Sequence, residues 1–320
     1  WRDWPVCDAG SGGRLAGTAA DIGSSPARIN VDWPSARRQK YLNLPDFTTQ
    51  LPRAVALDLD ETTLDSNTRL ADRTRRALHA VHDAGLPLVI ATSRPARVLP
   101  VLVGDDIMDI TSLVQMNGTM ATGRAGLTGS FRLPIDPGDA RLCWDITNEL
   151  APWVRMSMEI DGTRFAVNHH TEVDSTWAFG KAAPAEVLSI EEAMRIEPVK
   201  VSVNGLDRNL GHLADELDAR LSGRTVVLRT SNTGYLNVVP RRASKSGALA
   251  VLLDSVNIPL GDVLAFGDDY VDIDLVRDCG WSVAVDNAVP EIKVLARYST
   301  ASNDDYGVAI VLERLVSALR

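Results

Sequence analysis

From residue 53 onward, short apolar runs alternate with stretches whose apolar residues recur at helical spacing. The run RAVALDLD (53–60) predicts a buried strand, and residues 71–85 predict an amphipathic helix that ends at Gly85. Two more strands are expected in LPLVIATSR (86–94) and TSLVQMNG (111–118). Strands this apolar are buried on both faces, so the pattern predicts an α/β fold with a parallel sheet covered by helices on both sides.

The middle of the chain follows a different pattern. Residues 155–170 predict a hairpin that turns at Asp161-Gly162, and 189–205 predict a helix followed by a strand of alternating polar and apolar residues. An amphipathic helix (209–223) and further strand residues (224–240) come next. We interpret this part as an α+β module inserted into the first domain. The expected ranges are 53–132 and 237–320 for the first domain and 133–236 for the insert.

The first 52 residues differ from both parts. They are rich in Gly, Ser, Ala and Pro and show no sustained period of 3.6 or 2 residues. We expect residues 1–52 to form an extension that is mostly irregular.

Composition excludes several classes of protein. The chain has 33 basic and 42 acidic residues, a net charge of −9 and an isoelectric point near 5.1, which argues against a nucleic-acid partner. No apolar run is long enough for a membrane span, so no membrane partner is expected either. Cys7, Cys143 and Cys279 lie far apart, which favours reduced thiols in a cytoplasmic protein over a disulfide framework. The sequence gives no signal for an oligomeric state.

Two aspartates end the first predicted strand. Asp58 and Asp60 lie on one face of it, and an unpaired carboxylate buried there would be very costly. At the carboxyl end of the strand they would instead enter the crevice where open α/β sheets bind ligands. The alternative interpretation is that Asp60, Thr62 or Thr63 only caps the next helix.

A second acidic segment, FGDDYVDIDLV (266–276), also follows an apolar strand. Its clustered carboxylates repel one another unless a cation neutralises them, and Mg²⁺ held by Asp58, Asp268 and Asp272 would do so. A solvated acidic loop is the alternative. Two such loops at strand ends of one sheet favour the metal site.

Hydroxyl groups and a lysine follow two other elements. Thr92 and Ser93 come after the strand LVIA and offer hydroxyl and N–H donors to an anion. Lys245 stands just before a predicted helix, where it can bring a point charge to a phosphate. Each signal alone is weak, because similar turns commonly start helices.

Together these four segments resemble, in order and spacing, the motifs of the haloacid dehalogenase-like superfamily of phosphohydrolases. DLDETTLD resembles the first motif, ATSR the second, Lys245 the third and GDDYVD the fourth. The insert resembles the large α+β cap of the Cof-like sugar-phosphatase branch, and the resemblance covers residues 53–320. It implies a Rossmann-like core with an inserted cap domain.

The resemblance also implies roles for single residues. Asp58 would be the nucleophile that forms an aspartyl-phosphate, and Asp60 the general acid and then the base. Phosphoryl oxygens would be held by Thr92 and Lys245, which also stabilise the transition state. Further contacts to substrate or phosphate would come from Ser93, Arg94 and Asn117. Mg²⁺ would be bound by Asp58, the backbone carbonyl of Asp60, Asp268 and Asp272.

Several positions depart from the family pattern. Glu61 and Ser93 stand where glycine is usual, and Thr63 where leucine is usual. Val271 replaces an asparagine that precedes the last aspartate of the fourth motif. A valine cannot hydrogen-bond to phosphate or to metal-bound water, so either activity is reduced or Asp269 takes over the role.

The expected function is that of a Mg²⁺-dependent phosphatase acting on a small phosphorylated metabolite, above all a sugar phosphate. One alternative is a phosphatase for a nucleotide or for a cofactor such as pyridoxal phosphate. Another is a catalytically weak relative that binds a phosphorylated ligand. In the cap, the polar candidates to face the substrate are Arg164, His169, His170, Glu172 and Asp174.

Overall fold

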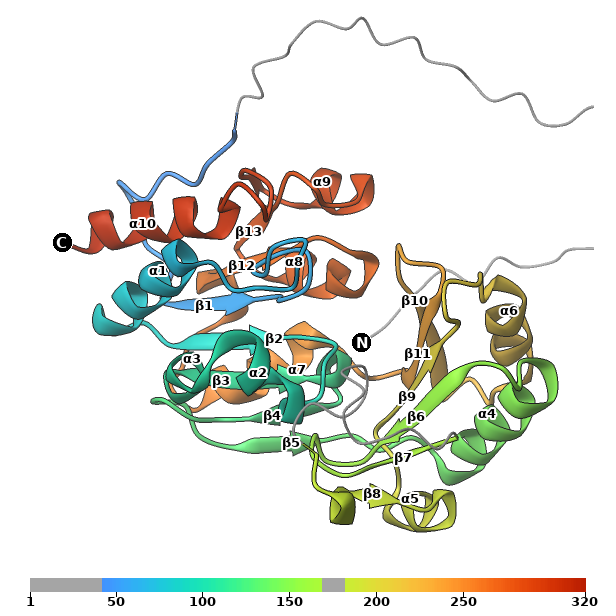
Figure 1. The fold of residues 1–320 in the computed structure, drawn as a ribbon. Coiled ribbons are helices and arrows are strands. Elements are labelled where there is room, and N and C mark those ends of the chain that lie inside the picture. The colour runs from blue at the N-terminus through green and yellow to red at the C-terminus, as the bar shows by residue number, and fades with distance from the viewer. Residues whose placement is uncertain (1–41, 169–181) are drawn as a thin grey trace, which may run out of the picture. The chain divides into compact units, whose positions relative to one another are not determined.

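The computed structural model describes residues 42–168 and 182–320 (Figure 1). Most of the expected N-terminal extension, and His169, His170, Glu172 and Asp174, therefore lie outside the described residues. Residues 42–52 contain no helix or strand, yet Phe47 is buried, with its ring 5.5 Å from that of Trp281. This short stretch is packed against the main body rather than free of it.

An eight-stranded sheet forms the core, in the order β14-β13-β12-β1-β2-β3-β4-β5. The central strands are β1 (Ala54–Leu57), β2 (Leu88–Ala91), β3 (Thr111–Gln115), β12 (Val263–Gly267) and β13 (Trp281–Ala284). Every residue in them is buried and they pair in parallel, as does the edge strand β14 (Tyr298–Ser299). At the other edge β4 (Met120–Thr122) and β5 (Ser130–Arg132) pair antiparallel. The predicted α/β fold is confirmed.

Alternate residues of each central strand serve two hydrophobic clusters, one on each face of the sheet. On one face Val55 and Leu57 belong to the cluster that includes α1 (Asp72–Asp83) and α10 (Gly307–Leu319). On the other face Ala54 and Ala56 belong to the cluster that includes α7 (Lys245–Asp254). The remaining core helices are α2 (Leu99–Val103), α3 (Asp105–Asp109), α8 (Ile273–Asp278) and α9 (Pro290–Leu295).

The inserted module has its own sheet of six strands, in the order β10-β11-β9-β6-β7-β8. Its strands are β6 (Arg155–Glu159), β7 (Phe165–Val167), β8 (Val187–Leu188), β9 (Lys200–Asn204), β10 (Thr225–Arg229) and β11 (Tyr235–Pro240). Its helices are α4 (Pro137–Leu150), α5 (Ile190–Ile196) and α6 (Gly211–Arg220). The expected boundary at residue 236 cuts through β11, because this strand continues to Pro240 before the chain returns to the core.

The two faces of this second sheet differ in polarity. Met156 and Met158 on β6, with Val201 and Val203 on β9, join the hydrophobic cluster under the helices. The intervening residues of the same strands are polar and point to the opposite face, because side chains alternate along a strand. The expected hairpin is present, with Glu159 paired to Phe165 and Gly162 in the turn at a φ of +85°.

Among the helices in the described residues, none has both the length and the apolar character that a membrane span requires.

Candidate active site

Three neighbouring parallel strands bring the predicted site residues to one edge of the core sheet. Asp58 directly follows β1, Thr92 follows β2 and Asp268 follows β12, and β1 pairs with both other strands. All three side chains are buried. Parallel strands share the end at which they stop, so residues far apart in the chain meet there.

A cluster of three carboxylates lies at this edge. Asp58, Asp268 and Asp272 each contribute an oxygen, and these oxygens lie within 4.8 Å of one another. Burial raises the pKa of all three above the ordinary value for aspartate, and neighbouring carboxylates add to the rise at Asp58 and Asp268. Like charges held together away from water create a strong local demand for a cation.

Lys245 lies between two of these carboxylates. Its Nζ donates to Asp58 Oδ1 and to Asp272 Oδ1, each at 2.6 Å, and its side chain is 1% exposed. Burial by itself would lower the pKa of Lys245, but the carboxylates of Asp272 and Asp58 outweigh it and raise that pKa above the ordinary lysine value. Lys245 therefore remains charged and partly neutralises the cluster.

The start of α7 holds Lys245 in place. Ser244 caps this helix by accepting from Gly247 N at 3.0 Å, and its hydroxyl donates to Asp274 Oδ2 at 2.5 Å. Ser246 N also donates to Asp274, at 2.9 Å. Asp274 is the second residue of α8. The bonds between α7 and α8 therefore fix the backbone position of Lys245.

The remaining oxygens of the cluster suit a divalent cation. Both oxygens of Asp272 already accept hydrogen bonds, Oδ1 from Lys245 and Oδ2 from the backbone N–H groups of Asp268 and Asp269. Thr62 donates to Asp268 Oδ1 at 2.7 Å. Within the described residues, Asp58 Oδ2 and Asp268 Oδ2 accept no hydrogen bond. Carboxylate oxygens from three residues within 4.8 Å of one another are a donor set that Mg²⁺ prefers.

Asp60 is held by Arg94 rather than by a helix terminus. The guanidinium donates a hydrogen bond from Nε to Asp60 Oδ2 at 2.8 Å and another from Nη2 to Oδ1 at 2.7 Å, which makes a bidentate ion pair. Burial opposes the charge of Arg94, but the bond to Asp60 reverses this and raises the Arg94 pKa. The guanidinium that was expected to contact substrate is thus engaged with the carboxylate of Asp60.

The remaining residues expected to contact phosphate are Thr92, Ser93 and Asn117, and they do not all lie in the same pocket. Ser93 lines the pocket described below, and Thr92 Oγ1 accepts from Arg94 N at 3.1 Å. Asn117 has a left-handed φ of 61° and is 3% exposed, and both polar atoms of its side chain have no partner within the described residues. It does not belong to the pocket wall, so its expected contact with phosphate is not apparent from the geometry.

A pocket of about 410 Å³ lies over the acid cluster and is lined by both sheets. The core contributes Asp58, Asp60, Asp268 and Asp272. Val271 is also in the wall, and Asp269 accepts from the backbone N–H of Ser231 at 3.0 Å. Asp269 also lines the pocket, so it contacts the cap module at the pocket wall. From the cap module, the polar lining residues are Ser157, Glu159, Lys200, Ser202, Asn204, Thr230, Ser231, Asn232, Tyr235 and Asn237.

This polar sheet face was missed as a functional surface, although the sequence contains its signal. Alternation in RMSME and KVSVN places Ser157, Glu159, Lys200 and Ser202 on one side of two paired strands. The expected cap candidate Arg164 instead pairs with Asp161 in its own turn, at 2.7 Å. A polar face of a sheet is either exposed to solvent or part of a binding site. The sequence pattern is the same in both cases, and the three-dimensional structure distinguishes them.

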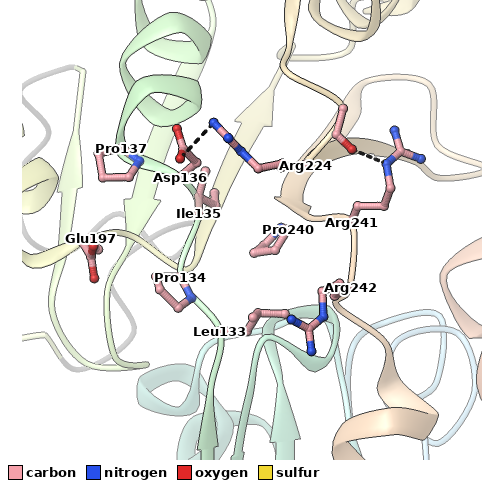
Figure 2. A pocket seen from close by; sticks show the side chains of 11 residues that line it. Leu133, Pro134, Ile135, Asp136, Pro137, Glu197, Arg224, Pro240, Arg241 and Arg242 are labelled. Atoms are coloured by element: carbon pink, nitrogen blue, oxygen red, sulfur yellow. Dashed lines mark hydrogen bonds and ion pairs between the residues drawn. The ribbon is translucent and has the colours of Figure 1, made fainter.

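A second hollow, of about 470 Å³, lies near the two connections between the sheets (Figure 2). Arg224 there forms an ion pair with Asp136 at 3.0 Å, and Arg241 Nε donates to the carbonyl of Gly223. Its wall contains none of the clustered aspartates, so size alone does not identify the site. The clustered aspartates line the other pocket.

Comparison with known proteins points to one family. The family model described as haloacid dehalogenase-like hydrolase matches residues 55–312. An HMP-PP phosphatase from Enterobacter sp. is 29% identical over 254 residues, covering 76% of this chain and 87% of the relative. A phosphoglycolate phosphatase from Methanothermobacter thermautotrophicus is 26% identical over 267 residues, covering 82% and 99%. The crystal structure of a haloacid dehalogenase-like hydrolase from Bacteroides thetaiotaomicron has a TM-score of 0.68 and 24% identity, covering 82% of this chain and 99% of that one.

Proposed function

Because the chain belongs to the haloacid dehalogenase-like hydrolase family and is a phosphoric monoester hydrolase, we propose that it is a Mg²⁺-dependent phosphatase for a sugar phosphate. The observation that carries this proposal is the pocket itself. Its floor is an acid cluster with a bound lysine, and its roof is a face of hydroxyl and amide groups. The reaction would proceed through an aspartyl-phosphate on Asp58.

In the first step, Asp58 would attack phosphorus while the bond from phosphorus to the ester oxygen breaks. Asp60 would give its proton to the departing alkoxide, which is a poor leaving group without it. Arg94 holds Asp60 by both carboxylate oxygens, so this acid is oriented before the substrate arrives.

In the second step, Asp60 would take a proton from water as the water oxygen attacks phosphorus and the bond to Asp58 breaks. Lys245 and Thr92 would hold the phosphoryl oxygens, and the charge of Lys245 would oppose the negative charge of the transition state. The bond from Lys245 to Asp58 supports this role, since it keeps the ammonium beside the attacking carboxylate.

Asp58 and Asp268 would bind Mg²⁺ directly through their free oxygens, with the Asp60 carbonyl, and Asp272 would act directly or through water. When bound, Mg²⁺ supplies positive charge that neutralises the phosphoryl oxygens and the carboxylates around them. The raised pKa values of the three aspartates support a requirement for such a cation.

The lining of the cap sheet supports a sugar as the leaving group. Ser157 faces Ser202 across β6 and β9, and Ser202 faces Asn237 across β9 and β11, so hydroxyl and amide groups form a continuous row. Such groups can both donate and accept hydrogen bonds, as a polyhydroxylated leaving group requires. Tyr235 is the one aromatic side chain in the wall, within the described residues. A nucleotide or pyridoxal phosphate phosphatase, which would need a stacking surface, is the second candidate.

We place the enzyme in the cytoplasm in this proposal. The spacing of its three cysteines supports a reducing compartment.

The test is phosphate release from a panel of sugar phosphates, a nucleoside monophosphate and pyridoxal phosphate, with Mg²⁺ and with chelator. The expected result is metal-dependent turnover that favours sugar phosphates and is lost in Asp58→Asn. Turnover that survives this substitution would contradict the proposal. A preference for the nucleoside monophosphate or for pyridoxal phosphate over the sugar phosphates would contradict it too. A binding protein without activity would release no phosphate in any condition.

A further inference from the structure

Lys200 is a buried lysine in the pocket wall whose ammonium donates a single hydrogen bond to the described residues. It is the first residue of β9, only 4% exposed, and lies on the polar face of the cap sheet. Its Nζ donates one hydrogen bond, to the carbonyl oxygen of Ser93 at 2.7 Å. An ammonium carries three N–H donors, and within the described residues the other two have no acceptor.

The charged groups around Lys200 are already committed elsewhere. Glu159 lies opposite it on β6, but accepts two bonds from Arg97, at 2.5 and 3.0 Å, and one from Ser157. Arg94 is paired with Asp60, and Lys245 with Asp58 and Asp272. Among the described residues of the wall, the cationic side chains are Arg94, Arg97 and Lys200, and the first two are in close ion pairs.

This arrangement is costly for the protein alone. Burial lowers the pKa of Lys200 to about 7, an effect that Glu159 and Asp60 oppose and that Lys245 and Arg94 reinforce. Replacing Lys200 by an apolar residue of similar length would relieve that cost. A ligand that accepts the remaining hydrogen bonds would explain why a buried lysine lies in the pocket wall.

We propose that Lys200 is a specificity-determining residue that donates hydrogen bonds to an oxygen of the leaving group. The oxygen belongs to a hydroxyl or a carboxylate carried by the part of the substrate that departs with the ester oxygen. This inference rests on the proposed phosphatase activity. It adds that the cap, not only the core motifs, selects the substrate by a charged donor.

The test compares Lys200→Met with wild type on three esters: a neutral sugar phosphate, a carboxylate-bearing sugar phosphate, and phenyl phosphate, whose leaving group offers no further oxygen. Loss of a charged hydrogen bond predicts a fall in kcat/KM of roughly 10–100-fold for the oxygenated esters, mainly through KM. Phenyl phosphate turnover should change little. Whichever oxygenated ester loses more identifies the acceptor as hydroxyl or carboxylate. Lys293→Met, on an exposed lysine of α9, is the matched control.

The pH dependence gives a readout that a structural role would not move. For wild type, KM for the oxygenated ester should rise as the pH passes above about 7, because the free enzyme loses the Lys200 proton there. This limb should be absent with phenyl phosphate and absent in Lys200→Met. The wild-type profile alone keeps the inference testable if the variant fails to fold.

Equal losses on all three esters, or a wild-type KM profile that is the same for phenyl phosphate, would overturn the inference and leave the phosphatase proposal intact. If wild type hydrolysed no phosphate ester with Mg²⁺, the proposed function itself would fail, and this inference with it.

Discussion

At the scale of single residues, the balance of charge around Lys245 explains why the site is poised for ligands. One ammonium is bonded to two of three buried carboxyl groups, so ionisation of the whole cluster would leave an excess of negative charge. A divalent cation would neutralise that excess, and the bound phosphate would then meet positive charge. The same residues would destabilise an ordinary core, and a bound cation and phosphate would explain their presence together.

Replacing Lys245 by methionine tests this balance. Asp58 and Asp272 would be left buried without their counter-charge, which should lower the free energy of unfolding by about 3–5 kcal/mol in chelator. The loss should grow from pH 5 to pH 8, because carboxyls with raised folded-state pKa values bind protons on folding, and this stabilisation disappears as pH rises. Urea unfolding at several pH values measures it.

The matched control is again Lys293→Met, whose exposed position predicts a change within about 0.5 kcal/mol. If both variants lost the same stability, or if the loss for Lys245→Met were independent of pH, the charge balance described for the cluster would be wrong.

Single residues also show what sequence reasoning can place. Strand ends and helix starts are readable in the chain, so Asp58, Thr92, Asp268 and Lys245 were predicted as site residues. Lys200 was not, because a lysine at the start of an alternating strand has no local feature that separates it from a solvated one. Its burial depends on packing between segments more than 100 residues apart in sequence.

At the scale of elements, the turn after β3 packs directly against the start of α7. Gly118 has a φ of +79°, and a Cβ placed there would lie 2.1 Å from Ser244 O and 2.6 Å from Lys245 N. No side chain fits in that space. The contact sets how close α7 approaches the sheet and therefore where Lys245 lies.

Gly118→Ala should therefore lower kcat and stability together. The strain at positive φ adds to the forced displacement of the helix start, each on the order of 1–3 kcal/mol. Gly126→Ala is the control, since Gly126 has a φ of +97° with nothing within 4 Å of its added Cβ. Gly126→Ala introduces the strain of a positive φ without a steric clash. Steady-state kinetics and thermal unfolding of both variants measure the difference, and equal effects on kcat would contradict this role.

Elements were predictable to the extent that their pattern was long enough. The buried strands β1, β2 and β12 were indicated by apolar runs, and α1 by its periodicity ending at Gly85. The short strands β4, β5, β8 and β14, of 2–3 residues each, were not expected. Such strands form because a neighbour offers free backbone groups, which no local pattern records.

At the scale of the whole molecule, several contacts connect the cap module to the core around the pocket. Three of the polar ones are the Arg97–Glu159 ion pair, the bond from Lys200 to Ser93, and the bond from Ser231 to Asp269. All three are made by residues that line the pocket. A ligand bound there would therefore contact both modules.

Mg²⁺ should stabilise the whole fold. A metal that binds only the folded state at 100 times its dissociation constant adds about 2.7 kcal/mol to the free energy of unfolding. The effect should grow with pH, because the raised pKa values of Asp58 and Asp268 mean that bound protons compete with the cation. Thermal unfolding with Mg²⁺ and with chelator measures it.

Asp268→Asn should abolish most of this stabilisation, whereas Asp106→Asn should preserve it. Asp106 is an exposed acid that pairs with His79 at 2.9 Å, far from the cluster in sequence and absent from the pocket wall. A Mg²⁺ shift that persists in Asp268→Asn would place the cation elsewhere.

The most direct test of the central claim is to trap the phosphorylated enzyme. In Asp60→Asn, p-nitrophenyl phosphate needs no proton for its leaving group, so the first step should proceed while the second lacks its base. Acid quench and peptide mass spectrometry should then show one phosphoryl group on Asp58, dependent on Mg²⁺ and absent from Asp58→Asn/Asp60→Asn. A phosphoryl group on another residue, or metal-dependent turnover with none on Asp58, would contradict the account.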